Sequence, residues 1–555
     1  MKRLGLFLLP VLGILLIWGT TQMQATDDTP GVSGQIVGAT GTPPTMTEVH
    51  LSSFEGSYRK PILSKTVGEN GEFSLGVSEP GTYRLWVTAS DHQVAGIPLI
   101  IETPEENVKT NIRLAAHEYK DSFDEVKILG TWNKFKWDEA DVMQRQEDGT
   151  YVFETDISAD TVAYQLLGIV DGRSVNGTMS DFFEHDGGGD YKSMLVVDGQ
   201  KVRIVFDPSK LLRPEGENVA SVTFDDAHQH LAEMFEIEQK MEQGVADYRT
   251  AKKSYQKQNG NAQGFSYDFS DVTTYLDKKM QSEQPLVREY AAVLYPKLYY
   301  YGYQPDAETY SRILETAPPE SQLWGSSVRP TVEGLALMDF ERAKEFAKSV
   351  YEQNSDKSIQ GEGLVQLSFL NLLKGNEDAY RSMFTVLKNN YADEVPQYQL
   401  VRLDPEASIA WGKPVPDFEV QLLDQSKTVS NESMLGKFYL VDFWATWCGP
   451  CIKEMPELHE AYETYKDQNF TILSLSMDAE KEDVRAFHEE RWDMPWLNAV
   501  VPDNWKSQLA ADFNVNVTGI PSPFLISPEG KILATHSALR GEYLHRTLAK
   551  YLGTN

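Results

Sequence analysis

The chain has 555 residues, and its 82 acidic against 51 Lys and Arg side chains give a formal net charge of −31 at neutral pH. This excess of negative charge argues against nucleic acid and against anionic membrane surfaces as partners, because both are themselves negatively charged. The length predicts several domains, and the chain contains only two cysteines.

Residues 1–25 have the outline of a secretory signal. Two basic residues precede an apolar run from Leu4 to Trp18, and small and polar residues follow as far as Ala25. The run is shorter than the roughly 20 residues of a membrane-spanning helix, which favours cleavage, although Met23 stands where cleavage sites usually have a small residue. We therefore expect an exported protein of the periplasm or cell envelope. An uncleaved anchor in the inner membrane is the alternative.

The segment 28–116 is predicted to be a small β domain. Strand-like runs separated by turns occupy residues 33–37, 69–75 and 81–87. Asn70-Gly71 lies between such runs and is a strong hairpin signal. The segment resembles the prealbumin-like or carboxypeptidase-regulatory β-sandwich that serves as an accessory module, and it contains no catalytic grouping.

The segment 121–214 is also rich in strand-like runs, and it weakly resembles immunoglobulin-like E-set modules that bind starch or glycogen. Trp132 and Trp137 are candidates for stacking on a sugar ring, so carbohydrate is one candidate partner. Tryptophans in such folds more often belong to the core, and sandwich folds are reused for many functions.

From 225 to 400 the apolar residues follow a helical period, and strand signals are few. We expect helices in antiparallel pairs, similar to a short tetratricopeptide-like solenoid without a clean repeat consensus. A run rich in tyrosine, from Tyr295 to Tyr303, either lines a groove or packs between helices, and its helical spacing favours packing.

The two cysteines, Cys448 and Cys451, lie three positions apart and can pair only with each other or with thiols of a partner. A disulfide that closes so short a loop removes little entropy from the unfolded chain, so it is a poor structural staple. Half of a zinc site is the alternative, but a structural zinc needs four ligands and the chain has no second cysteine pair. Thiol redox chemistry is the better interpretation.

The cysteines lie where a strand turns into a helix. Residues 437–444 form a short apolar run of strand formers, and helical spacing begins at about Lys453. Cys448 is therefore expected near the first turn, where free backbone N–H groups and the helix dipole can lower a thiol pKa to about 3.5–7.5. This makes Cys448 the candidate nucleophile and Cys451 the resolving thiol.

Residues 408–555 resemble the thioredoxin fold and, in Phe443-Trp-Ala-Thr-Trp-Cys448 with Lys453-Glu-Met-Pro456, its extracytoplasmic TlpA/ResA-like branch. Residues 412–418 look like the N-terminal hairpin of that branch, and Thr518-Gly-Ile-Pro521 resembles its cis-proline loop. The resemblance implies a thiol-disulfide oxidoreductase with no cofactor beyond the Cys448–Cys451 disulfide and no metal. It implies that substrate is bound by Trp447, Gly449, Pro450, Gly519, Ile520 and Pro521.

Two acids near the thiols are further catalytic candidates. Asp442 matches the buried aspartate of cytoplasmic thioredoxins, and burial would raise its pKa and suit it to accept the proton of Cys451. Residues 471–477 supply no lysine to partner it. Glu454 matches a glutamate of the ResA-like branch and would raise the thiol pKa by like-charge repulsion. An acid in the first turn of a helix is otherwise simply favourable to the dipole.

We therefore predict a multidomain chain with a C-terminal α/β thioredoxin fold (408–555), preceded by two β-sandwich-like modules and an α-helical region. The predicted activity is reduction of cell-envelope protein disulfides, with cytochrome c maturation as one role. Gly-Pro between the cysteines resembles reducing thioredoxins, which lie near roughly −270 mV. A membrane electron donor would then be needed. The alternatives are a disulfide oxidase or isomerase, and a redox-sensing scaffold whose N-terminal modules capture a glycan or protein.

Overall fold

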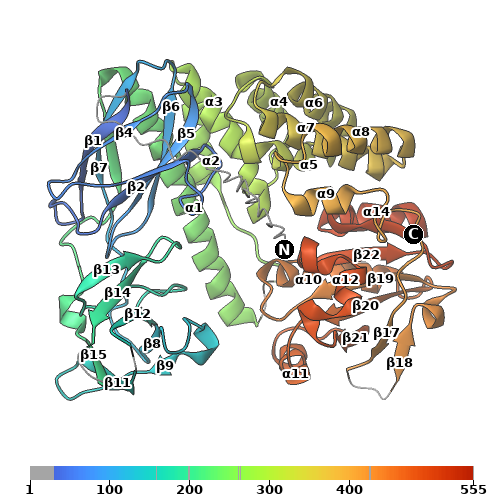
Figure 1. Ribbon diagram of the computed structural model, residues 1–555. Helices are drawn as coiled ribbons and strands as arrows, with labels where there is room; N and C mark the ends of the chain where they lie inside the picture. Colours follow the sequence, from blue (N-terminus) through green and yellow to red (C-terminus); the bar gives the residue numbers. More distant parts are fainter. Residues whose placement is uncertain are drawn as a thin grey trace, which may run out of the picture. The chain divides into compact units, whose positions relative to one another are not determined.

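A computed structural model describes residues 30–553 except 158, 198–200, 261, 263 and 424–426 (Figure 1). The predicted signal or anchor, residues 1–25, lies outside the described residues. Within the described part, no helix is both long and apolar enough to cross a membrane. The chain divides into two compact units, Met1–Ala232 and Glu233–Asn555.

The first unit begins with two four-stranded sheets. One has the order β16 (Ser221–Phe224), β7 (Asn107–Arg113), β1 (Gly31–Val37), β4 (Glu72–Gly76), and the other β3 (Leu63–Thr66), β2 (Glu48–Ser53), β5 (Gly81–Thr88), β6 (Ala95–Ile101). Strand β7 alternates buried and exposed residues, as expected of a strand with one face in the core. Strand β16 pairs antiparallel with β7, so this sheet takes a strand from far beyond the predicted segment 28–116.

Asn70-Gly71 does not join a hairpin of paired strands. Gly71 has the positive φ of +83° that a tight turn requires. However, β3 before the turn pairs with β2, whereas β4 after it pairs with β1 in the other sheet. The hairpin prediction was therefore wrong in its pairing, because the turn signal is local and the choice of partner strand is not.

The second β module has a five-stranded and a three-stranded sheet. The first has the order β13 (Phe182–His185), β14 (Tyr191–Val196), β12 (Thr161–Leu167), β8 (Lys127–Gly130), β9 (Asp141–Val142), and the second β10 (Gln144–Arg145), β11 (Tyr151–Asp156), β15 (Lys201–Phe206). Trp132 packs on this module's core, stacks on Phe153 at 5.1 Å between ring centroids, and donates to Asp141 at 2.7 Å. Trp137 is 54% exposed.

The next part of the chain is helical, as the apolar spacing predicts. Its helices are α1 (Gln229–Asn259), α2 (Ser270–Lys279), α3 (Pro285–Leu294), α4 (Ala307–Thr316), α5 (Val328–Ala336), α6 (Phe340–Gln353), α7 (Lys357–Lys374), α8 (Glu377–Asn390) and α9 (Gln397–Leu403). From α5 to α8 each helix packs against the next one in the chain. Side-chain caps define several of these starts: Asp339 accepts from Arg342 N at α6, and Asp356 accepts from Ser358 N at α7.

The C-terminal domain is built on a five-stranded sheet. A hairpin of β17 (Glu419–Gln421) and β18 (Thr428–Ser430) precedes the sheet, which has the order β21 (Leu497–Val500), β20 (Phe470–Ser476), β19 (Phe438–Trp444), β22 (Ser522–Ile526), β23 (Ile532–Thr535). Strand β19 runs parallel to β20 and antiparallel to β22. The helices are α10 (Gly449–Tyr465), α11 (Lys481–Glu490), α12 (Gln508–Asp512), α13 (Val515–Thr518) and α14 (Glu542–Leu552). This is the predicted thioredoxin fold.

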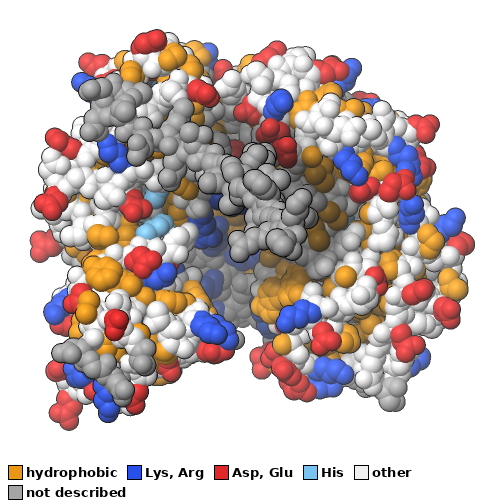
Figure 2. All heavy atoms as spheres, in the orientation of Figure 1, with side chains coloured by type: hydrophobic (Ala, Val, Ile, Leu, Met, Phe, Trp, Pro, Cys, Tyr) orange, Lys and Arg blue, Asp and Glu red, His pale blue; other side chains and the backbone are white. Residues whose placement is uncertain are grey.

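The helical region packs directly on this domain within the second unit, where α9 contacts α13. Tyr543 on α14 donates to the Glu333 carbonyl at 2.7 Å, and Lys550 donates to the Leu373 carbonyl at 2.9 Å. Figure 2 shows acidic side chains interspersed with Lys and Arg over the visible face, so the net negative charge is not gathered there into one patch.

Candidate active site

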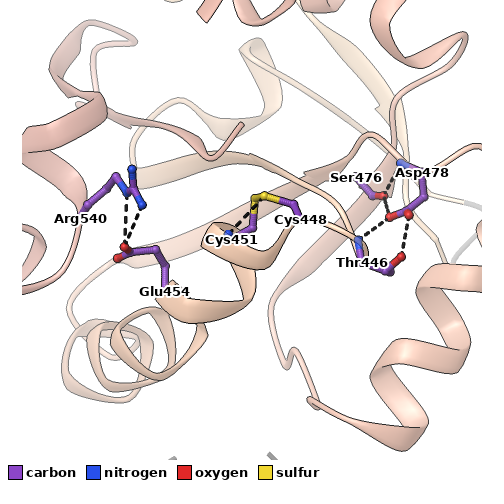
Figure 3. The surroundings of a disulfide bond; sticks show 7 residues. All are labelled: Thr446, Cys448, Cys451, Glu454, Ser476, Asp478 and Arg540. Atoms are coloured by element: carbon purple, nitrogen blue, oxygen red, sulfur yellow. Dashed lines mark hydrogen bonds and ion pairs between the residues drawn. A yellow bond between two sulfur atoms is a disulfide. The ribbon is translucent and has the colours of Figure 1, made fainter. Parts of the chain in front are cut away.

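Cys448 and Cys451 form a disulfide at the start of α10 (Figure 3). Cys448 is the N-cap residue, and its sulfur accepts a hydrogen bond from the Cys451 backbone N–H at 3.2 Å. Gly449 and Pro450 open the helix, where a proline costs no hydrogen bond because the first N–H groups have no partner within the helix. Cys448 and Cys451 are 5% and 2% exposed. The Cys448 sulfur lies at the helix N-terminus, the position that the sequence predicted for it.

A buried carboxylate fixes the loop that carries Cys448. Asp478 is 2% exposed and accepts from the Thr446 N–H at 2.9 Å and from the Thr446 hydroxyl at 2.7 Å. The Ser476 hydroxyl donates to the same carboxylate at 2.6 Å (Figure 3). Sequence reasoning missed this aspartate. Its signal was its position, because Thr446 and Asp478 each follow one of two adjacent parallel strands, β19 and β20.

The peptide bond between Ile520 and Pro521 is cis, as the family resemblance implied. Ser522 lies opposite Phe443 in the pairing of β22 with β19. Pro521 therefore lies at the end of β19 that leads into the cysteine loop. Gly519 has a φ of +73°, and Gly519 and Ile520 are both partly exposed. The cis-proline loop and the cysteine loop therefore lie together at the C-terminal end of β19.

Asp442 is buried in the middle of the sheet, as its apolar neighbours predicted. It is 4% exposed and lies between Ser474 on β20 and Pro523 on β22. The pKa of Asp442 is raised to about 7, mainly by burial and also by the Glu454 carboxylate, while the Arg540 guanidinium acts to lower it. The carboxyl group can therefore exchange a proton near neutral pH.

Glu454 is held by an ion pair. Its carboxylate accepts from Arg540 at 3.2 and 3.3 Å and from the Gly541 N–H at 2.8 Å (Figure 3). The sequence suggested that Glu454 repels a negative charge on Cys451, but the Arg540 charge offsets much of that repulsion. Arg540 lies 86 positions away in the chain, and no local pattern connects it to Glu454.

Two tryptophans lie on the exposed side of the site. Trp447, directly before Cys448, is 59% exposed, and its ring centroid lies 6.4 Å from that of Trp505. Exposed aromatic rings beside a reactive group are suited to contact a partner, because they bury a large apolar area.

A cavity of about 600 Å³ lies between the helical region and the C-terminal domain, and Glu454 is part of its lining. Its lining includes Tyr299, Tyr300 and Tyr303 of the tyrosine-rich run. Lys453 donates to the Tyr300 carbonyl at 2.6 Å, which ties α10 to that run. Tyr295, at the start of the run, is buried in helix packing. Some tyrosines of the run therefore line a cavity, whereas Tyr295 packs between helices.

One group of side chains among the described residues has a geometry that could hold a metal ion: Glu457, Glu460 and His545. Glu457 already bonds to His545 at 2.7 Å, and the group is largely on the surface. The two cysteines are joined to each other. We assign no metal role to either group.

A central buried strand that leads into a Cys-Gly-Pro-Cys helix, opposite a cis-proline, defines the class of the domain as thioredoxin-like. The AhpC/TSA family model matches residues 411–535. Thiol-disulfide oxidoreductase ResA of Bacillus thuringiensis is 30% identical over 147 residues, which are 26% of this chain and 79% of that protein. Thioredoxin-like protein YneN of Bacillus subtilis is 32% identical over 133 residues, covering 24% of this chain and 74% of its own.

Among solved structures, the thioredoxin domain of a thiol-disulfide oxidoreductase from Bacteroides vulgatus is 33% identical, with a TM-score of 0.24. The match covers 26% of this chain and 99% of that one. Because ResA of Bacillus thuringiensis is 30% identical over 79% of its own length, the chain belongs, by its C-terminal domain, to the ResA-like thiol-disulfide oxidoreductases.

The Asp478 carboxylate is expected to be a main support of the cysteine loop. We predict that Asp478→Ala lowers the free energy of unfolding by about 2–4 kcal/mol, because three donors lose a charged acceptor in a buried place. Denaturant unfolding measures the change, and Asp467→Ala, at an exposed position, is the matched control. A loss no larger than that of the control would contradict this role.

The raised pKa of Asp442 also makes a prediction for stability. Its folded-state pKa of about 7 lies above the ordinary 3.8, so between these values the folded protein keeps a proton that the unfolded chain has lost. Wild-type stability therefore falls as the pH rises through this window. In Asp442→Asn that loss is absent, so the stability of the variant relative to wild type should rise by on the order of 3 kcal/mol between about pH 4 and pH 8.

Denaturant unfolding at several pH values measures this difference. Asp467→Asn, which removes an exposed carboxyl group, should show a difference from wild type that hardly changes with pH. An equally flat profile for Asp442→Asn would mean that the Asp442 pKa is ordinary.

Proposed function

We propose that the protein is an exported reductase of protein disulfides whose active site is the Cys448–Cys451 pair. In the reduced enzyme, the Cys448 thiolate attacks one sulfur of a substrate disulfide, forms a mixed disulfide and expels the other substrate sulfur as a thiolate. Cys451 then gives its proton to the Asp442 carboxylate and attacks the Cys448 sulfur. The second substrate thiolate leaves, so the substrate is reduced and the enzyme is oxidised to the disulfide.

The observation that carries this proposal is the position of the disulfide at the first turn of α10, directly after the strand that contains the buried Asp442 carboxyl group. The helix N-terminus favours the anionic form of Cys448, which the attack on the substrate disulfide requires. Asp442, with a pKa of about 7, is partly ionised at neutral pH and can accept a proton. Glu454 acts on this step through Asp442, whose pKa it raises.

Substrate binding is assigned to the surface around the disulfide. Trp447 offers an exposed ring, and Gly449 and Pro450 leave the Cys448 side of the helix without bulky side chains. Gly519 and Ile520, before the cis Pro521, offer backbone groups that an extended substrate segment can pair with. The backbone supplies affinity that does not depend on the substrate sequence.

Export to the cell envelope is supported by the N-terminal signal pattern and by the family of the C-terminal domain. A reductase in that compartment consumes electrons at each turnover, so a membrane electron donor completes the cycle. Oxidised cysteine pairs of apocytochrome c are one substrate class, and misformed protein disulfides are another. The net charge of −31 speaks against nucleic acid as a partner.

The two β modules and the helices are proposed as accessory parts. Residues 28–116 and 121–214 are assigned to the prealbumin-like and E-set-like classes, and 225–400 to the tetratricopeptide-like class. Of the two tryptophans, Trp137 is the one proposed to stack on a sugar ring, because Trp132 is packed on Phe153 and bonded to Asp141.

Cysteine variants test the order of attack. Cys448→Ser should abolish reduction of a disulfide-bonded peptide, because Cys448 is the thiol at the N-cap of α10, where the anionic form is favoured. Cys451→Ser should still attack but should accumulate a mixed disulfide with the peptide, which mass spectrometry detects. Adduct formation in Cys448→Ser, or full turnover in Cys451→Ser, would reverse or remove the assigned roles.

The reduction potential of the pair tests the direction of the reaction. Equilibration of the purified protein in graded thiol redox buffers, followed by quantification of free thiols, should give a value near roughly −270 mV. A value near roughly −120 mV would identify an oxidant and overturn the proposal of a reductase.

A further inference from the structure

The cis-proline loop, residues 518–522, is held from the helical region as well as from its own domain. Arg402 on α9 donates from its guanidinium to the Thr518 carbonyl at 2.8 Å. At the other end of the loop, the Ser522 hydroxyl and His536 Nδ1 are hydrogen-bonded at 3.2 Å. The two contacts bracket Gly519, Ile520 and the cis Pro521.

The arginine is fixed in place by its surroundings. Helix α9 packs against α13, whose last residue is Thr518. The guanidinium carbon lies 5.1 Å from the centre of the Tyr398 ring, so the cation also stacks on an aromatic face. Burial lowers the pKa of Arg402 to about 10, and the group therefore stays charged at neutral pH. A charge kept in such a place must be compensated by its hydrogen bonds.

A cavity of about 50 Å³ lies behind this contact, and both Arg402 and His536 are part of its lining. Four buried polar atoms on its lining residues have no hydrogen-bond partner among the described residues: Arg402 Nε, His536 Nε2, Gln366 Oε1 and Gln399 Oε1. Buried polar atoms are nearly always hydrogen-bonded, and a cavity of this size with several unpartnered polar atoms on its lining can hold water. Bridging water would link α7 and α9 to the residues behind the loop.

We propose that Arg402 is a positioning residue for substrate binding, and that the helical region thereby forms part of the substrate-binding machinery of the thioredoxin domain. This inference rests on the proposed function, because it concerns the loop that receives the substrate backbone. Arg402 acts through Thr518 and does not contact the reacting sulfurs.

The chemistry of the contact determines what its loss should change. Without the guanidinium donor, the Thr518 carbonyl loses its partner and the loop that follows is held at one end only. A substrate that pairs with the backbone of Gly519 and Ile520 then has to order the loop as it binds. A small aromatic disulfide reaches Cys448 without backbone pairing. The loss should therefore affect binding of peptides and leave the thiol chemistry intact.

The experiment compares Arg402→Met with wild type on two probes. A fluorescent disulfide-bonded peptide, turned over with dithiothreitol as reductant and corrected for the rate without enzyme, reports backbone binding. The reaction of 5,5′-dithiobis(2-nitrobenzoate) with reduced protein from which dithiothreitol has been removed reports thiol reactivity. We expect KM for the peptide to rise about tenfold with little change in kcat, because a loosened loop no longer holds the peptide in register. The rate with the small disulfide should stay within about twofold of wild type.

Two further variants sharpen the result. Arg402→Lys keeps the charge but loses the planar fork, so it should restore peptide KM only in part. Arg381→Met removes a half-exposed arginine of α8 that pairs with Glu377 and Glu406, away from the loop, and should match wild type on both probes. If Arg402→Met fails to fold by circular dichroism, the KM of Arg402→Lys decides the question.

An unchanged peptide KM in folded Arg402 variants would overturn the inference. Equal losses on both probes would also overturn it, because they would show general damage to the site. Failure of the wild-type protein to reduce either probe would instead refute the proposed function, so the two failures are distinguishable.

Discussion

Burial of strand β19 on both faces is the constraint on which the candidate site depends. Its seven residues are almost all inaccessible because β20 and β22 pair with its edges while helices cover the sheet. The strand carries Asp442 into an apolar environment and ends directly before the loop of Cys448. Its pairing with β22 brings Pro521 to the same end of the strand as the cysteine loop. A carboxyl group with a raised pKa, a thiol at a helix N-terminus and a backbone binding edge thus follow from one buried strand.

The electrostatics of the site are arranged as a chain of neighbours. Arg540 neutralises Glu454, Glu454 raises the pKa of Asp442, and Asp442 lies on the strand that leads into the cysteine loop. None of these groups is fully exposed, so their mutual effects are weakly screened by solvent and salt. Any change in the ion pair is therefore expected to reach the cysteines through the proton affinity of Asp442, even though the ion pair itself takes no part in bond making.

A feature of the site was predictable from the sequence when the residues that form it lie close together in the chain. The cysteine helix, the buried Asp442 and the proline loop were predictable because strand, turn and helix signals lie within a few residues of the chemistry. Asp478, Arg540 and Arg402 were not, because they reach the site from other elements and are ordinary surface residue types in sequence. The same limit explains the error at Asn70-Gly71, where the turn was recognised but tertiary pairing sent its two strands to different sheets.

Strand β16 has a consequence for how the molecule is made. It completes the first sheet by pairing with β7, yet the whole second β module lies between these two strands in the chain. During synthesis from the N-terminus, the first sheet therefore lacks one edge strand until residue 224 has left the ribosome. Until then β7 exposes unpaired backbone groups, which is a hazard for misassociation between nascent chains. The inserted module has all its own strands by residue 206 and can be complete earlier, so the module that starts first is finished last.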